Sequence, residues 1–182
     1  MNALRAIVSS KRGRAMWRLL LAMVAGWFLV TGGAAQADLS DGVLGYWGLN
    51  ETSGTTAADE LGTYDGTISG PPSLGVSGKL DTAYDFDNDD DYITVSPGVP
   101  LANHDFSLSF WVNRDGTGED WAIGHSTGGG NQALHVGFRD ADTFAFAFWG
   151  NDLNINDGMF NNTSDWIHFV CTYEESTKNQ KV

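Results

Sequence analysis

The sequence has little cysteine and few basic residues, and each shortage narrows what the protein can be. Cys171 is the only cysteine among 182 residues, so an intramolecular disulfide is excluded. It lies in an apolar stretch, which favours a buried, inert thiol over a catalytic one. Only 10 Lys and Arg stand against 23 Asp and Glu. A nucleic-acid-binding protein needs a basic surface, so this composition argues against nucleic acid as a partner.

A long hydrophobic run is also lacking. The apolar run Leu19–Val30 is shorter than the roughly 20 residues that span a bilayer. A basic stretch precedes the run, and the small-residue site Ala35-Gln36-Ala37 follows it. These three parts, in this order, are typical of a secretory signal peptide, with an uncleaved membrane anchor as the alternative. We therefore expect residues 1–37 to be a helical signal peptide that is removed on export.

Removal of that leader leaves residues 38–182, a length suited to one domain. Half of the Lys and Arg residues lie in the leader, whereas every Asp and Glu follows it, so the remaining formal charge is −18. This charge suits divalent cations and neutral or basic ligands. We expect a secreted protein, located outside the cell, at its surface or in a periplasm, with no membrane contact after cleavage.

The rest of the chain consists of short strand-like segments separated by turn-forming residues. In Phe106–Asn113 the apolar residues alternate with polar ones, which is the period of a strand with one buried face. No segment carries a sustained helical period, so an all-β fold is expected. The predicted strands are Val43–Leu49, Tyr64–Ile68, Ala83–Phe86, Tyr92–Val95, Phe106–Asn113, Trp121–His125, Ala133–Phe138, Thr143–Trp149 and Trp166–Tyr173.

Three of these segments, in order, resemble the laminin-G-like, concanavalin A-like lectin/glucanase domain of secreted proteins. They are Ala83–Val95, Phe106–Val112 and Trp166–Tyr173. The resemblance implies an antiparallel two-sheet jelly-roll sandwich over residues 38–182. In that family the third segment is followed by a hairpin and further strands, whereas this sequence stops at Val182. We therefore expect the sandwich to lack its C-terminal strands.

A catalytic reading rests on Gly124–Gly128, which matches the G-x-S-x-G nucleophile elbow around Ser126. Asp140 and His168 follow in the right order for a triad. However, the elbow leads into glycines rather than a helix, and no βαβ pattern surrounds it. No pair of carboxylates suited to glycoside hydrolysis is evident either. We expect no enzyme, with a secreted glycan or ester hydrolase as the alternative.

Two sets of residues are candidate binding sites. Asp87, Asp89 and Asp91 crowd one turn and could bind Ca²⁺ through oxygen ligands, although a solvated Asp-rich turn is the plainer interpretation. The resemblance adds support for calcium binding, because calcium sites occur in laminin-G-like domains.

Trp111, Trp149 and Ser109 are the candidate ligand-binding residues. On the strands Phe106–Asn113 and Thr143–Trp149, small residues and one Trp share the face opposite the main apolar one. Such faces could form a shallow groove for an extracellular glycan, unless a loop covers them as ordinary core. The leading hypothesis is a calcium-assisted extracellular module that binds carbohydrate or a protein surface. A structural or adhesion module without a small ligand is the other alternative.

Overall fold

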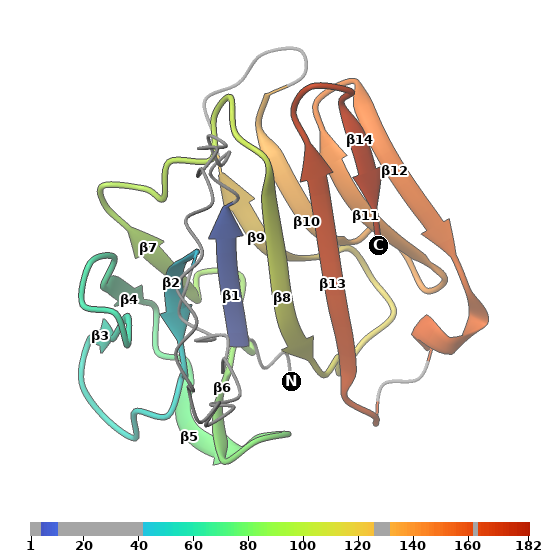
Figure 1. The fold of residues 1–182 in the computed structure, drawn as a ribbon. Coiled ribbons are helices and arrows are strands. Elements are labelled where there is room, and N and C mark those ends of the chain that lie inside the picture. The colour runs from blue at the N-terminus through green and yellow to red at the C-terminus, as the bar shows by residue number, and fades with distance from the viewer. Residues whose placement is uncertain (1–4, 11–41, 126–131, 162–163) are drawn as a thin grey trace, which may run out of the picture.

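The chain folds into antiparallel β-sheets, two of which pack face to face (Figure 1). The computed structural model describes residues 5–10, 42–125, 132–161 and 164–182. The larger packed sheet has the order β14 (Asn179–Lys181), β13 (Ile167–Glu174), β8 (Phe106–Val112), β1 (Arg5–Ser10) and β2 (Val43–Trp47). The other has the order β12 (Asn151–Asn156), β11 (Thr143–Phe148), β10 (Leu134–Phe138) and β9 (Asp120–His125).

Two smaller sheets lie beside one end of this sandwich (Figure 1). One has the order β3 (Thr56–Ala57), β4 (Gly66–Ser69) and β7 (Tyr92–Val95). The other pairs β5 (Ser73–Ser77) with β6 (Thr82–Asp85). Within the described ranges the helical structure is one short 3-10 turn, η1 (Gly158–Asn161), and no helix there is long and apolar enough to cross a membrane. The all-β antiparallel sandwich is therefore confirmed.

The core forms where the inward faces of the two packed sheets meet. Phe110 on β8 and Phe169 on β13 face Phe144 on β11, whose ring stacks on that of Phe169 at 3.8 Å and 7°. Phe106 on β8 also contacts the other sheet, where its ring packs edge-on against that of Phe146 with ring centroids 6.2 Å apart. All five rings are at most 4% exposed. The strict alternation of β8 places its apolar side chains here, as the sequence predicts.

One buried carboxylate organises the loop between β3 and β4. Asp59 is 3% exposed, and its two oxygens accept four backbone N–H groups, those of Tyr46 (2.8 Å), Leu61 (3.1 Å), Thr63 (3.1 Å) and Tyr64 (2.9 Å). Burial alone would raise its pKa, but these donors hold the pKa below the ordinary value. Asp59 thus fixes the loop to β2 in its ionised form.

A buried guanidinium joins loops just beyond the end of β8. Arg114 is 1% exposed and forms an ion pair with Asp120 at 3.0 Å. It also donates to the carbonyl oxygens of Gly118 (2.7 Å) and Phe160 (3.1 Å), and it lies 4.0 Å from the ring of Phe138. Because each donor has an acceptor within the protein, Arg114 acts as a structural clamp.

Several elements were not expected from the sequence. Strands β3, β5, β12 and β14 are not among the predicted strands, and β1 lies within the predicted leader. Residues 5–10 of the predicted helical leader are thus a strand, and its apolar run Leu19–Val30 lies outside the described residues. Cys171 is fully buried, and burial raises its pKa to about 12, so the thiol is inert as expected.

A candidate ligand-binding face on the four-stranded sheet

The outer face of the four-stranded sheet has a floor of small residues. On β11, Phe144 points into the core, so the alternate residues Ala145 and Ala147 lie on the opposite face. Register places Gly137 of β10 opposite Ala145. A side chain at Gly137 would meet the Asp120 carbonyl oxygen at 2.2 Å, where β9 bulges. Gly137, Ala145 and Ala147 are all buried, so larger side chains on this face cover the small residues.

One side of the floor carries aromatic and cationic groups. Trp121 of β9 is 41% exposed, and register places it opposite Gly137. Its ring meets His135 edge-on at 4.9 Å and has the Arg139 guanidinium 5.5 Å from its centroid. Its indole N–H donates to Glu119 at 2.8 Å. The ring is thus held in place while a large part of it faces solvent.

The other side of the floor is polar and comes from β12. Arg139 reaches across the sheet and donates to Asn154 Oδ1 at 2.9 Å and to Asp152 Oδ2 at 2.7 Å. Asn154 and Asp152 lie opposite Ala145 and Ala147 in the β11–β12 ladder. Both members of the Arg139–Asp152 pair remain about one-third exposed. These groups present donors and acceptors beside the aromatic ring.

Trp149, one of the residues singled out from the sequence, lies at the end of this face. It follows β11 directly, and its N–H donates to the Gln132 carbonyl oxygen at 2.8 Å, which extends the pairing beyond β11. Trp149 lies in the turn between β11 and β12, just beyond the paired residues of the sheet. Trp149 is 67% exposed, so the alternative that it is ordinary core is wrong.

Trp111 and Ser109 lie elsewhere, so the predicted groove shared by Trp111 and Trp149 is corrected. Both residues are on the outer face of β8 in the five-stranded sheet, turned away from the sheet that carries Trp149. His168 of β13 joins them: its Nε2 is 2.9 Å from Ser109 Oγ, and its ring is 4.8 Å from that of Trp111. Lys79 lies 5.2 Å from the same indole. The Trp111 ring is therefore already in contact with two side chains.

The acidic turn does not assemble a metal centre from Asp87, Asp89 and Asp91. Among the residues that the structure describes, no three His, Cys, Asp or Glu side chains gather to hold a metal ion. Asp87 instead accepts a hydrogen bond from the Asn88 amide at 2.6 Å. Two buried oxygens nevertheless have no hydrogen-bond partner, Oδ1 of Asp91 and Oδ1 of Asp85 on β6. Burial first, and then neighbouring carboxylates, raise the pKa of Asp85.

The parts of the possible triad are put to other uses. Ser126 lies outside the described residues. One oxygen of Asp140 accepts the N–H groups of Asp142 and Thr143 at 2.9 and 2.8 Å, which shapes the β10–β11 turn. His168 hydrogen-bonds Ser109 instead. Asp140 and His168 therefore do not pair with each other as the serine-hydrolase alternative would need.

Sequence comparison points to one family. A family model described as the concanavalin A-like lectin/glucanases superfamily matches residues 87–181, slightly more than half of the chain. No curated protein and no solved structure matches the chain. The matched region contains the whole four-stranded sheet, together with the exposed residues Trp121 and Trp149.

Proposed function

Because the chain belongs to the concanavalin A-like lectin/glucanases superfamily, we propose that it is an extracellular, non-catalytic module that binds carbohydrate on the outer face of its four-stranded sheet. The family supports a carbohydrate- or protein-binding module in general. The choice of carbohydrate rests on one observation. Trp121 is exposed on this face beside a row of polar side chains, and Trp149 is exposed where β11 ends. A small number of well-placed polar groups beside an aromatic surface is typical of sites that bind small ligands.

The chemistry of this face favours a neutral sugar. An indole ring offers an apolar surface to the C–H face of a pyranose, while Asp152, Asn154 and Arg139 offer partners for its hydroxyl groups. Arg139 is already paired with Asp152, so it acts as a hydrogen-bond donor rather than as a free positive charge. The chain also carries a net charge of −13, which disfavours acidic glycans.

The spacing of the two tryptophans favours an oligosaccharide over a single sugar. Trp121 is two strand spacings from Ala145 of β11, and Trp149 comes four residues after Ala145, directly beyond the end of that strand. Standard strand geometry converts this offset to about 16 Å between their Cα atoms. Contact with both rings therefore needs a ligand several sugar units long.

A glycan array probed with the full chain tests the proposal. We expect binding to neutral oligosaccharides, weakened at least tenfold by Trp121→Ala, which corresponds to about 1.4 kcal/mol. Trp149→Ala should weaken long ligands more than short ones. Trp111→Ala, on the other sheet, is the matched control and should bind as the parent does. Silence on the array, or equal losses from all three variants with folding intact, would favour a structural or adhesion module instead.

Calcium binding at the Asp87–Asp91 turn is a separate proposal. It is supported by the unpartnered carboxylate oxygens of Asp85 and Asp91, since a buried oxygen without a donor is costly and a cation would satisfy it. Thermal unfolding with CaCl₂ and with a chelator tests it. An ion that binds only the folded state raises the midpoint. Identical midpoints would argue against any calcium in this turn.

The extracellular location is likewise a proposal, supported by the leader pattern of residues 1–37. N-terminal sequencing of the exported protein should begin at Asp38. An intact N-terminus on a membrane-bound product would support the anchor alternative.

A further inference from the structure

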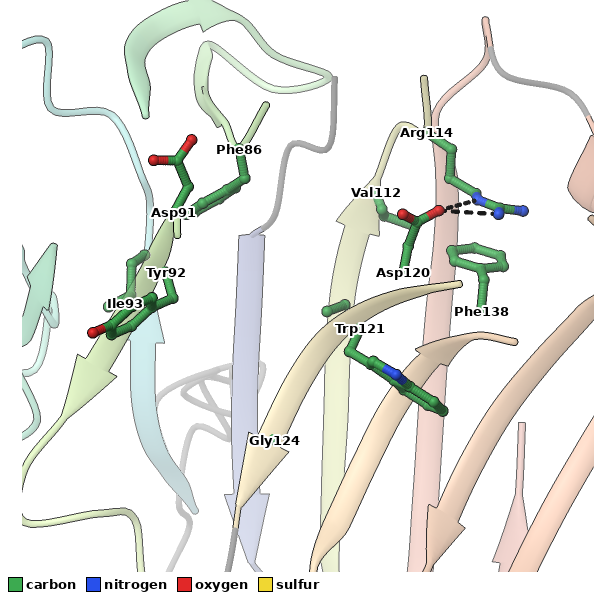
Figure 2. A pocket seen from close by; sticks show the side chains of 11 residues that line it. Phe86, Asp91, Tyr92, Ile93, Val112, Arg114, Asp120, Trp121, Gly124 and Phe138 are labelled. Atoms are coloured by element: carbon green, nitrogen blue, oxygen red, sulfur yellow. Dashed lines mark hydrogen bonds and ion pairs between the residues drawn. The ribbon is translucent and has the colours of Figure 1, made fainter. Parts of the chain in front are cut away.

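A large hollow lies at the end of the sandwich where β13 turns back into β14 (Figure 1). Its volume is about 820 Å³, against about 250 Å³ for the hollow between β7 and β9 that Figure 2 shows. Sites for small ligands are hollows of roughly 300–1,000 Å³, so this one has the size of a binding site. We call it the end cavity and define it by Asn103, Gln132, Phe148, Asn151, Tyr173 and Glu175.

The inner wall of the end cavity is aromatic. The ring of Tyr173 lies 4.9 Å from that of Phe148 and 5.4 Å from that of Phe106, and all three residues line the cavity. Behind them Phe106 and Phe148 pack against Phe146, which is fully buried in the core. The core therefore closes the cavity on its inner side. A ligand that enters meets aromatic rings, which suit the apolar C–H face of a sugar.

Three amide side chains around the end cavity are not committed to the fold. The amides of Asn103, Gln132 and Asn151 form no hydrogen bond with any other residue that the structure describes. Each amide offers both a donor NH₂ group and an acceptor oxygen. A sugar hydroxyl group also donates and accepts, so it can pair with either end of an amide. Amides beside an aromatic wall therefore fit a neutral ring that carries several hydroxyl groups.

The turn between β13 and β14 gives the end cavity a fixed mouth without adding net charge. Glu175 forms an ion pair with Lys178 and accepts a hydrogen bond from the Tyr173 hydroxyl at 3.0 Å. The Glu175 N–H donates to Asp105 Oδ1 at 2.7 Å, which ties this turn to the start of β8. Lys178 has a φ of 57°, a backbone conformation that the surrounding structure must hold in place. Since Lys178 balances Glu175, the mouth favours a neutral ligand.

The turn that carries Trp149 borders the end cavity. Phe148 and Asn151, which flank this turn, both line the cavity. The Trp149 N–H also donates to the carbonyl oxygen of Gln132, another residue of the wall. A glycan that extends along β11 from the level of Trp121 therefore reaches the cavity once it passes Trp149. Because the core closes the inner side, the glycan cannot continue through, and only its end can enter.

We propose that the end cavity holds the terminal sugar unit of a neutral oligosaccharide whose inner units lie on the outer face of the four-stranded sheet. This inference rests on the proposed carbohydrate-binding function and adds which part of the glycan is recognised. The protein binds glycan chains by one end, and it does not bind segments in the middle of a long chain.

The test uses the full chain and the linear neutral glycan that gives the strongest signal on the glycan array. Titration calorimetry compares this glycan with two derivatives, each carrying a bulky aromatic group on one of its two ends. We expect one derivative to bind at least tenfold more weakly than the free glycan and the other to bind as the free glycan does. Equal binding of all three forms would overturn this inference and leave the carbohydrate-binding proposal standing, whereas silence on the array would overturn both.

Matched variants locate the effect in the end cavity. Ala102 is exposed and lines the cavity, so Ala102→Trp should fill part of it and weaken binding of the free glycan at least tenfold, whereas Ala58→Trp, exposed elsewhere, should not. Asn151→Ala removes one amide of the wall and should weaken binding, with Asn179→Ala on β14 as its control. Circular dichroism confirms that each variant is folded. The difference between the free and the end-blocked glycan should disappear in Ala102→Trp, and its persistence there would overturn the assignment to this cavity.

Discussion

Asp59 offers the sharpest test of how the loop between β3 and β4 is held. In Asp59→Asn one carboxylate oxygen becomes an NH₂ group, which faces two backbone N–H donors instead of accepting from them. Either amide orientation leaves two of the four donors without an acceptor. A hydrogen bond to a charged group contributes about 1.5–3 kcal/mol, so losing two should lower the free energy of unfolding by about 3–6 kcal/mol. Asp89→Asn, in an exposed turn, is the control and should change it by less than about 0.5 kcal/mol.

Urea unfolding followed by tryptophan fluorescence measures this loss as a lower midpoint with an unchanged slope. The pH dependence gives a second check. The pKa of Asp59 in the folded chain lies below its ordinary value of 3.8, so its contribution is complete above that value and is lost as the pH falls through the folded pKa. The gap between the parent and Asp59→Asn should therefore narrow below about pH 4. A loss under about 1 kcal/mol at pH 7, or a gap independent of pH, would refute the reasoning.

Three further predictions follow from buried or strand-forming groups. Arg114→Met should lower the free energy of unfolding by about 3 kcal/mol, because it leaves buried carbonyl oxygens and Asp120, which is 28% exposed, without their donor. Arg114→Lys should restore only part of this loss. Equal urea stability of Arg114→Met and the parent would contradict the prediction. With its pKa raised to about 12, Cys171 should react with a thiol reagent at pH 8 no faster than the domain unfolds; immediate labelling of folded protein would count against that burial. A chain that starts at Asp38 lacks β1, so amide exchange in β2 should accelerate; unchanged protection there would show that β2 does not need β1.

The sequence predicted the sandwich well because its central strands follow simple alternation. In β8 the inward and outward sets are cleanly apolar and polar, and the structure buries the apolar set. Strand β12 was missed because Asn and Asp are uncommon in strands, although Leu153 and Ile155 already alternate with them. At an outer position of a half-buried sheet, such residues are acceptable.

The candidate site could be predicted only in part, because it depends on register between strands. Alternation within one strand identified Trp149 and its small neighbours. It could not show that Trp121 lies across the same face, or that Arg139, read as a turn residue, reaches Asp152 thirteen positions away. The same limit explains why Trp111 was placed in one groove with Trp149, since nothing local to a strand says which sheet it joins.

The position of β1 has a consequence for the proteolytic processing of the chain. Arg5–Ser10 forms ladders with β2 on one side and with β8 on the other, and β2 and β8 form no ladder of their own. If the sheet forms before a peptidase cuts after Ala37, the severed leader is an interior strand rather than a loose tail. Hydrogen bonds on both flanks would then retain it as a short second polypeptide. Cleavage would then give a complex of two chains. The edge of β2 would be exposed only when the β1 fragment dissociates, not when the peptide bond is cut.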